Sequence, residues 1–226
     1  MRLPDDPARF LESTAFVDSD APGVIAFARE VCAGEADEAA KAVRLYYAVR
    51  DRITYTPYCD FLSPETYRAS ACLARGSGFC VAKAALLAAV ARAAGIAARV
   101  GFADVRNHLT TPRLRERMGG DVFYYHGYVE LYLGGRWLKA TPAFDRALCE
   151  RFGVQPLEFD GQADSLFHPY DRSGRRHMEY LRDRGAQADV PAADIMATFE
   201  RAYPNLTKGG LPAGRFHEEA RPATDD

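Results

Sequence analysis

Residues 76–95 read GSGFCVAKAALLAAVARAAG, and this stretch decides the fold. The Gly-Ser-Gly run at 76–78 breaks the chain, and residues 80–94 then hold mostly Ala, Val and Leu, with neither Gly nor Pro. Gly95 stands where a helix commonly ends on glycine. Because apolar residues cover nearly the whole circumference of this helix, we expect it to be buried at the centre of a domain.

Before this helix the apolar residues recur at helical spacing, and after it they alternate as in strands. Alternating apolar, aromatic and β-branched residues predict strands at 96–105, 122–133 and 136–141, and Gly134-Gly135 supplies a two-residue hairpin turn. Helices are expected from 22, over 35–52, from 63 and over 191–203. Helices first and an antiparallel sheet afterwards give an α+β fold. We expect one domain over residues 1–203 and a flexible tail over 204–226.

Composition limits the classes of function. The chain has 226 residues, 48% hydrophobic and 27% charged, with a net charge of -2, so we expect a packed core and no nucleic-acid partner. Lys83, Arg92 and Arg99 interrupt the most apolar stretch, which excludes a membrane span. The amino terminus lacks the apolar region of a secretory signal, and the five cysteines form no C-x-x-C pair. We therefore expect a cytoplasmic protein with reduced thiols and neither a metal nor a cofactor.

Cys80 is the candidate nucleophile. It opens the central helix directly after the glycine-rich break. The N–H groups at a helix N-terminus favour a thiolate and can also receive an oxyanion. Position alone leaves a buried structural cysteine about equally acceptable. The other four cysteines lack this context.

His126 is the candidate general base, because a nucleophilic thiol is commonly activated by an imidazole. It lies inside the 122–133 strand, where alternation predicts that it shares a face with Tyr124, Tyr128 and Glu130. A hydrogen-bonded structural histidine is the alternative for this residue taken alone.

Several segments together resemble the transglutaminase-like family. The run at 76–80 followed by ARAAGIAARV at 91–100 is similar to its G-x-C turn and R-A-x-G-I-P-A-R helix end. The HGYVE run at 126–130 resembles its H-x-W-V-E strand, and Gly135-Arg136-Trp137 resembles its G-x-W return strand. The resemblance covers roughly residues 70–145. It implies a papain-like α+β fold and a Cys-His-Asp triad that forms a thioester with an amide substrate.

Carried over to this chain, the resemblance makes Cys80 the nucleophile and His126 the general base. The family's Asp position holds Thr141 here, and the nearest carboxylate is Asp145. The hairpin turn pairs 133 with 136, which makes Asp145 a diagonal neighbour of His126 if the strand continues past Pro142. We predict Asp145 as the residue that orients His126, with Thr141, Asp121 and Asp171 as the alternatives.

Three functions follow in order of preference. The first is a cysteine peptidase, amidase or acyltransferase that acts on a peptide or protein amide. The second is an inactive module of the same fold that binds peptide or protein partners. The third is a metal site formed by His168, His177 and a cysteine, whose spacing matches no common ligand pattern. The polar segment from His168 to His177 has no assigned role.

Overall fold

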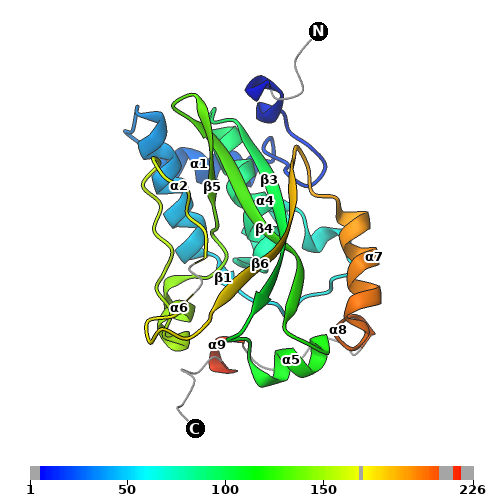
Figure 1. Cartoon of the computed structure of the whole chain (residues 1–226). Coiled ribbons are helices and arrows are strands. Elements are labelled where there is room, and N and C mark those ends of the chain that lie inside the picture. Colours follow the sequence, from blue (N-terminus) through cyan, green and yellow to red (C-terminus); the bar gives the residue numbers. More distant parts are fainter. Residues whose placement is uncertain (1–5, 168–169, 209–215, 220–226) are drawn as a thin grey trace.

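A four-stranded antiparallel sheet in the order β5-β4-β3-β6 forms one layer of the molecule (Figure 1). The computed structural model describes residues 6–167, 170–208 and 216–219. The strands are β3 (Ala98–Asn107), β4 (Val122–Leu133), β5 (Arg136–Ala140) and β6 (Met178–Gln187). The predicted α+β fold class is confirmed.

Helix α4 (Cys80–Ala93) is the centre of the core, as its composition predicts. Its residues 80–92 are all buried. It packs against β3 and β4 on one side and against three helices on the other. These helices are α1 (Pro22–Val31), α2 (Glu38–Arg52) and α3 (Ala69–Arg75). The many alanines of α4 leave room for close neighbours on both sides.

The remaining elements are short or peripheral. Strands β1 (Thr54–Tyr55) and β2 (Ser77–Gly78) pair in parallel beside the start of α4. Helices α5 (Pro112–Met118), α6 (Arg146–Phe152), α7 (Ala192–Ala202), α8 (Pro204–Lys208) and α9 (Phe216–Glu219) lie around the sheet, with the 3-10 turns η1 (Pro7–Leu11) and η2 (Pro64–Thr66).

The hairpin has the predicted register, with Leu133 opposite Arg136. Strand β5 ends at Ala140, however, so the register that would bring Asp145 diagonally beside His126 does not continue past Pro142. Proline has no N–H to donate to a sheet ladder, which accounts for the break at this point. Strand β6, which the sequence analysis does not predict, adds to the other edge of the sheet through β3.

Two short helices lie within the segment expected to be a flexible tail. Helices α8 and α9 both fall beyond residue 203, and each has a buried apolar side chain, Leu206 in α8 and Phe216 in α9. Burying these side chains stabilises an ordered position for both segments. The other tail residues, 209–215 and 220–226, lie outside the described residues.

Two charged side chains in the core hold chain segments together. Lys83 is fully buried in α4, and its Nζ donates to the carbonyl oxygens of Arg50 at 2.8 Å and Ile53 at 2.6 Å. Arg92 donates from the last turn of α4 to the carbonyl oxygens of Glu12, Ala98 and Ala188. Within the described ranges no helix is long and apolar enough to cross a membrane.

We predict that Lys83→Met destabilises the protein by about 3 kcal/mol, because two buried carbonyl groups at the end of α2 lose their donor. Urea unfolding followed by circular dichroism measures this. Lys41→Met, at a partly exposed position of α2, is the matched control and should change stability by less than about 0.5 kcal/mol. Equal stability of the two variants would show that Lys83 does not hold the end of α2.

Candidate active site

Cys80 is the first residue of α4 and is 6% exposed. Burial raises the pKa of its thiol to about 11, although the backbone N–H groups of Gly127, Val81 and Cys80 itself lower it by donating towards the sulfur. The thiol is therefore neutral at pH 7. The same N–H groups form a positive environment around the sulfur in which negative charge is stabilised.

A close approach of two backbones brings β4 to this sulfur. A Cβ atom added to Gly127 would lie 2.8 Å from Val81 Cα and 3.1 Å from the Cys80 carbonyl oxygen. Only glycine leaves this space free. Because Gly127 directly follows His126, the close approach places the two predicted catalytic residues on adjoining segments.

His126 is 4% exposed and pairs with Ala103 across the sheet. Gly127 faces α4, so strand alternation directs the His126 ring to the opposite face, where it packs against Phe167 at 5.2 Å between ring centroids. Burial lowers the pKa of His126 to about 4, and its Nε2 has no hydrogen-bond partner. Among the described residues, no hydrogen bond joins this ring to the Cys80 sulfur or to the Asp145 carboxylate.

A β-bulge next to His126 changes the predicted alternation. Tyr124 and Tyr125 together lie opposite Asp104, so Phe123 pairs with Val105 and Tyr124 no longer shares a face with His126. Tyr125 has a φ of 55°, which is uncommon for a bulky residue and is held by the surrounding structure.

Asp104 and Arg184 hold this bulge. The buried Asp104 carboxylate accepts the Tyr125 N–H at 3.2 Å and two hydrogen bonds from Arg184, at 2.6 and 2.9 Å. The Arg184 guanidinium also lies 4.1 Å from the centre of the Tyr125 ring. Neither residue was singled out from the sequence. An acidic residue inside the predominantly apolar 96–105 strand was the available signal.

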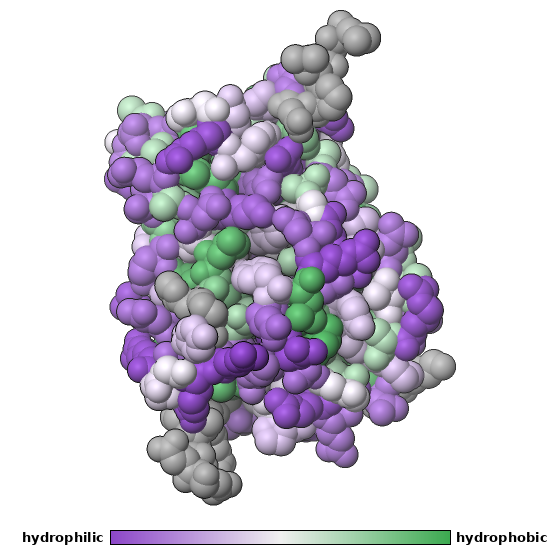
Figure 2. Space-filling model, viewed as in Figure 1, coloured by the Kyte–Doolittle hydropathy of each residue, from purple (hydrophilic) through white to green (hydrophobic). Residues whose placement is uncertain are grey.

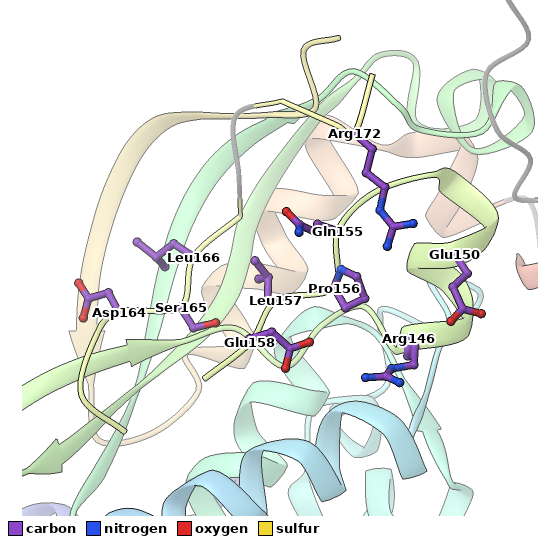
Figure 3. A pocket seen from close by; sticks show the side chains of 10 residues that line it. All are labelled: Arg146, Glu150, Gln155, Pro156, Leu157, Glu158, Asp164, Ser165, Leu166 and Arg172. Atoms are coloured by element: carbon purple, nitrogen blue, oxygen red, sulfur yellow. The ribbon is translucent and has the colours of Figure 1, made fainter. Parts of the chain in front are cut away.

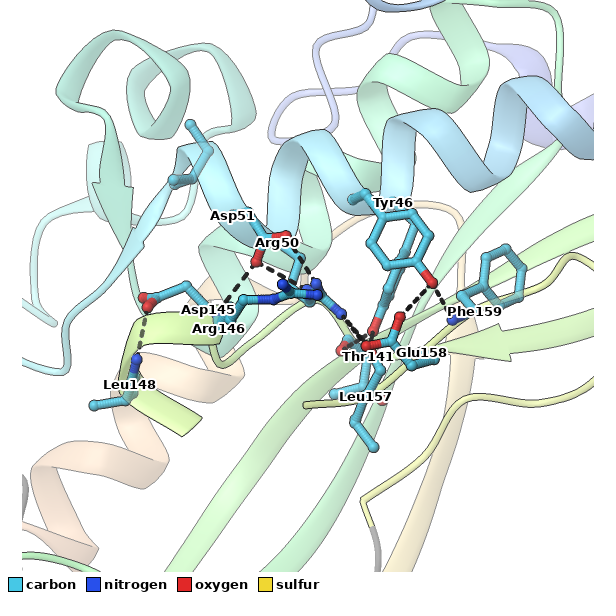
Figure 4. Close-up of polar contacts among 12 residues, drawn as sticks. Tyr46, Arg50, Asp51, Thr141, Asp145, Arg146, Leu148, Leu157, Glu158 and Phe159 are labelled. Atoms are coloured by element: carbon cyan, nitrogen blue, oxygen red, sulfur yellow. Dashed lines mark hydrogen bonds and ion pairs between the residues drawn. The ribbon is translucent and has the colours of Figure 1, made fainter. Parts of the chain in front are cut away.

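Asp145 lies at the N-terminus of α6, where its carboxylate caps the helix by accepting the Leu148 N–H at 2.9 Å (Figure 4). It also accepts the Tyr55 N–H at 3.0 Å, and His217 Nε2 lies 3.1 Å from its Oδ2. Burial opposes ionisation of this carboxyl group, but the contacts with His217 and the two N–H groups hold its pKa below the usual value. The structure thus brings Asp145 together with His217.

The alternative orienting residues lie in different environments. Thr141 is 1% exposed and its Oγ1 has no hydrogen-bond partner, while its carbonyl accepts from Tyr46 (Figure 4). Asp121 lies 3.4 Å from Arg106, and both side chains are partly exposed. Asp171 closes a turn with Arg175 at 2.9 Å. Thr141 is therefore the one of the three whose polar side-chain atom is buried and unpaired.

The Cys80 thiol lies at a small apolar cavity of about 30 Å³. Its walls come from β1, α4, α5, β4, α7 and α8. Its aromatic wall residues include Tyr55, Phe79, Phe123, Phe199 and Tyr203. A cavity of this size holds about one water molecule, so a substrate must displace part of the wall.

The larger cavities lie elsewhere. One of about 640 Å³ is lined by charged and polar side chains of the 146–172 region, including Arg146, Glu150 and Arg172, and neither Cys80 nor His126 borders it (Figure 3). Another, of about 430 Å³, includes Phe167, the residue that contacts the His126 ring. The face over β6 is largely hydrophilic with small separate apolar patches (Figure 2).

The alternative metal site, the least preferred of the three functions, is only partly described, because His168 lies outside the described residues. His177 is buried and packs against Phe167 at 5.6 Å. In the part of the chain that the structure describes, no three His, Cys, Asp or Glu side chains gather as a metal site requires.

Comparison with known proteins identifies the family of this chain. The model of the transglutaminase-like superfamily matches residues 25–142, a little over half of the chain. The chain belongs to the transglutaminase-like superfamily. No curated protein matches it.

Two solved structures resemble this transglutaminase-like chain. One, described as "a Putative Cysteine Protease from Cytophaga hutchinsonii", has a TM-score of 0.53 at 17% identity and covers 85% of this chain and 50% of that chain. Another, described as "a putative protease from Parabacteroides distasonis ATCC 8503", has a TM-score of 0.38 at 15% identity and covers 71% of this chain and 29% of that chain. This chain thus spans half the length of the first and less of the second. The first likeness supports the papain-like fold.

We predict that the alkylation rate of Cys80 by iodoacetamide rises about tenfold per pH unit between pH 7 and pH 10. The reason is that the pKa of the buried thiol is raised to about 11, so the thiolate fraction keeps growing over this range. Peptide mapping by mass spectrometry measures the rate at Cys80 alone, and circular dichroism at each pH controls for unfolding. A rate that is already constant from pH 7 would instead indicate a thiolate–imidazolium pair.

Proposed function

We propose that this chain is a cysteine-dependent enzyme of the transglutaminase-like type that cleaves or transfers amide groups of peptides or proteins. The observation that carries the proposal is the contact between the first turn of α4 and β4, which sets the Cys80 sulfur beside the N–H of Gly127, one residue from His126. The five unpaired cysteines support a reducing compartment such as the cytoplasm.

In the proposed reaction, Cys80 Sγ attacks the amide carbonyl carbon and its proton passes to His126, whose ring must first leave its packing against Phe167 on the opposite face of β4 to come within reach of the sulfur. Because the pKa of the thiol is raised and that of the imidazole is lowered, the proton is transferred during the attack rather than before it. The N–H groups of Val81 and Gly127 stabilise the developing oxyanion. The intermediate then expels the amine, which takes the proton from His126, and leaves a thioester on Cys80.

The thioester is released in a second step with the same residues. His126 accepts a proton from water or from an acceptor amine, whose oxygen or nitrogen attacks the thioester carbon. The Cys80 thiolate leaves and takes the proton back from His126. Water gives hydrolysis and an amine gives acyl transfer, and both outcomes belong to the proposal.

Asp145 is the proposed orienting residue. Its carboxylate is 5% exposed, and it binds the N–H of Tyr55, whose side chain forms a wall of the Cys80 cavity. In this role the carboxylate holds the imidazole in one tautomer and stabilises the imidazolium that forms during the attack. It must exchange its contact with His217 for one with His126.

We predict that the protein hydrolyses members of a panel of peptidyl amides and thioesters, and that Cys80→Ala lowers the rate at least about 10³-fold. His126→Ala should lower it about 10²- to 10⁴-fold, because the base is lost. Intact mass spectrometry after rapid acid quench should detect an acyl group on Cys80.

The matched control is Cys32→Ser, on a partly exposed cysteine outside the site, which should keep full activity. Hydrolysis that persists unchanged in Cys80→Ala would contradict the proposal. Absence of activity over the whole panel, with peptide binding retained in Cys80→Ser, would instead support a binding module of the same fold.

We predict that Asp145→Asn lowers kcat about 10²-fold or more while the fold is kept, since Asn caps a helix as well as Asp does. Thr141→Val, which removes the unpaired hydroxyl at nearly constant volume, should change kcat less than about threefold. Steady-state kinetics and thermal unfolding of both variants measure this. If Thr141→Val lowers kcat more than Asp145→Asn does, and Thr141→Ser keeps the wild-type kcat, the orienting role belongs to Thr141.

A further inference from the structure

Helix α9 packs against an aromatic surface next to the proposed site; this surface, formed by Tyr55, Tyr58 and Phe152, is called the groove below. Phe216 is 4% exposed, and its ring packs against the rings of Tyr55 at 5.8 Å, Tyr58 at 5.7 Å and Phe152 at 6.1 Å. Tyr55 is the last residue of β1, Tyr58 follows β1, and Phe152 belongs to α6; in Figure 1, α9 lies below α6 and beside α5. A single side chain thus fills a socket built by two separate parts of the chain.

Charged contacts fix both ends of this segment. His217 Nε2 lies 3.1 Å from the Asp145 carboxylate, and Glu219 pairs with Arg113 of α5 at 2.7 Å. Glu219 also accepts a hydrogen bond from the Tyr58 hydroxyl. Glu218, between them, is exposed. The groove therefore recognises an aromatic side chain and, three residues later, a carboxylate.

The groove shares residues with the proposed site. Tyr55 packs on Phe216 and also forms a wall of the cavity at Cys80. Asp145, the proposed orienting residue, is the partner of His217. A segment bound in the groove therefore touches the Cys80 cavity wall on one side and the orienting carboxylate on the other.

We infer that this groove is a peptide-binding subsite for segments in which an aromatic residue precedes an acidic residue by three positions, and that α9 occupies it as an internal competitor. The inference names the substrate class of the site and so rests on the proposed function. When a peptide of this class displaces α9, the Asp145 carboxylate loses its contact with His217, and the Tyr55 ring loses its contact with Phe216.

The first experiment tests the competition in the full chain. We expect Phe216→Ala and Glu219→Gln each to raise the rate of Cys80 alkylation at pH 8, by about tenfold for the aromatic change, since each shifts α9 out of the groove. Glu218→Gln is the matched control, because this glutamate lies on the same turn with an exposed side chain, and it should leave the rate unchanged. Thermal unfolding of each variant checks that the fold is intact.

The second experiment tests recognition without catalysis. A fluorescent peptide of residues 213–220 should bind the Cys80→Ala, Phe216→Ala protein, as measured by anisotropy, and bind at least about tenfold more weakly when α9 is intact. The same peptide carrying Phe216→Ala should not bind. Because Cys80 is absent, binding here stands even if the chain proves to have no hydrolase activity.

Two results would overturn the inference. One is equal alkylation of the wild type, Phe216→Ala and Glu219→Gln, which would make α9 a structural element unrelated to access. The other is lack of peptide binding to the Phe216→Ala protein, which would show that the groove does not recognise a separate peptide.

Discussion

The close approach between Gly127 and the first turn of α4 is the constraint on which the rest of the structure depends. It allows β4 to supply an N–H to the Cys80 sulfur while the neighbouring His126 ring occupies the other face of the sheet. A side chain at 127 would push the helix off the strand by the width of a methyl group. One backbone contact therefore fixes the sulfur and the strand that carries the imidazole, with the two side chains on opposite faces of that strand.

Buried charges keep this arrangement rigid. Lys83, one turn after Cys80, ties α4 to the end of α2, and Arg92 ties the other end of α4 to the start of β3. Asp104 and Arg184 hold the backbone of Tyr125 in an unfavourable conformation directly before His126. Lys83 and Arg92 are the charged residues that exclude α4 as a membrane span. Their side chains donate hydrogen bonds to carbonyl groups inside the core.

The sequence predicted the parts of the fold that depend on local pattern. Helix α4 follows from its alanines and bounding glycines, and the β4–β5 hairpin follows from Gly134-Gly135. Strand β6 and helix α9 were not predicted, because β6 pairs with the distant strand β3 and α9 packs against Tyr55 and Arg113. The candidate residues Cys80 and His126 came from their places in these local elements. The surroundings of Asp145 could not be predicted, since they depend on where β5 ends and on His217, 72 residues further along the chain.

The electrostatics of the site indicate what a substrate must supply. The Cys80 thiol and the His126 imidazole are both buried and both neutral at pH 7, while the charged Asp145 is compensated by hydrogen bonds outside the cavity. Neutral groups are the less costly form in a closed apolar site, because an isolated charge there would lose its hydration. In the proposed mechanism, charge separation becomes favourable only when an oxyanion develops beside the N–H groups of Val81 and Gly127. On that proposal, burial keeps the thiol unreactive until a carbonyl group has displaced the cavity wall.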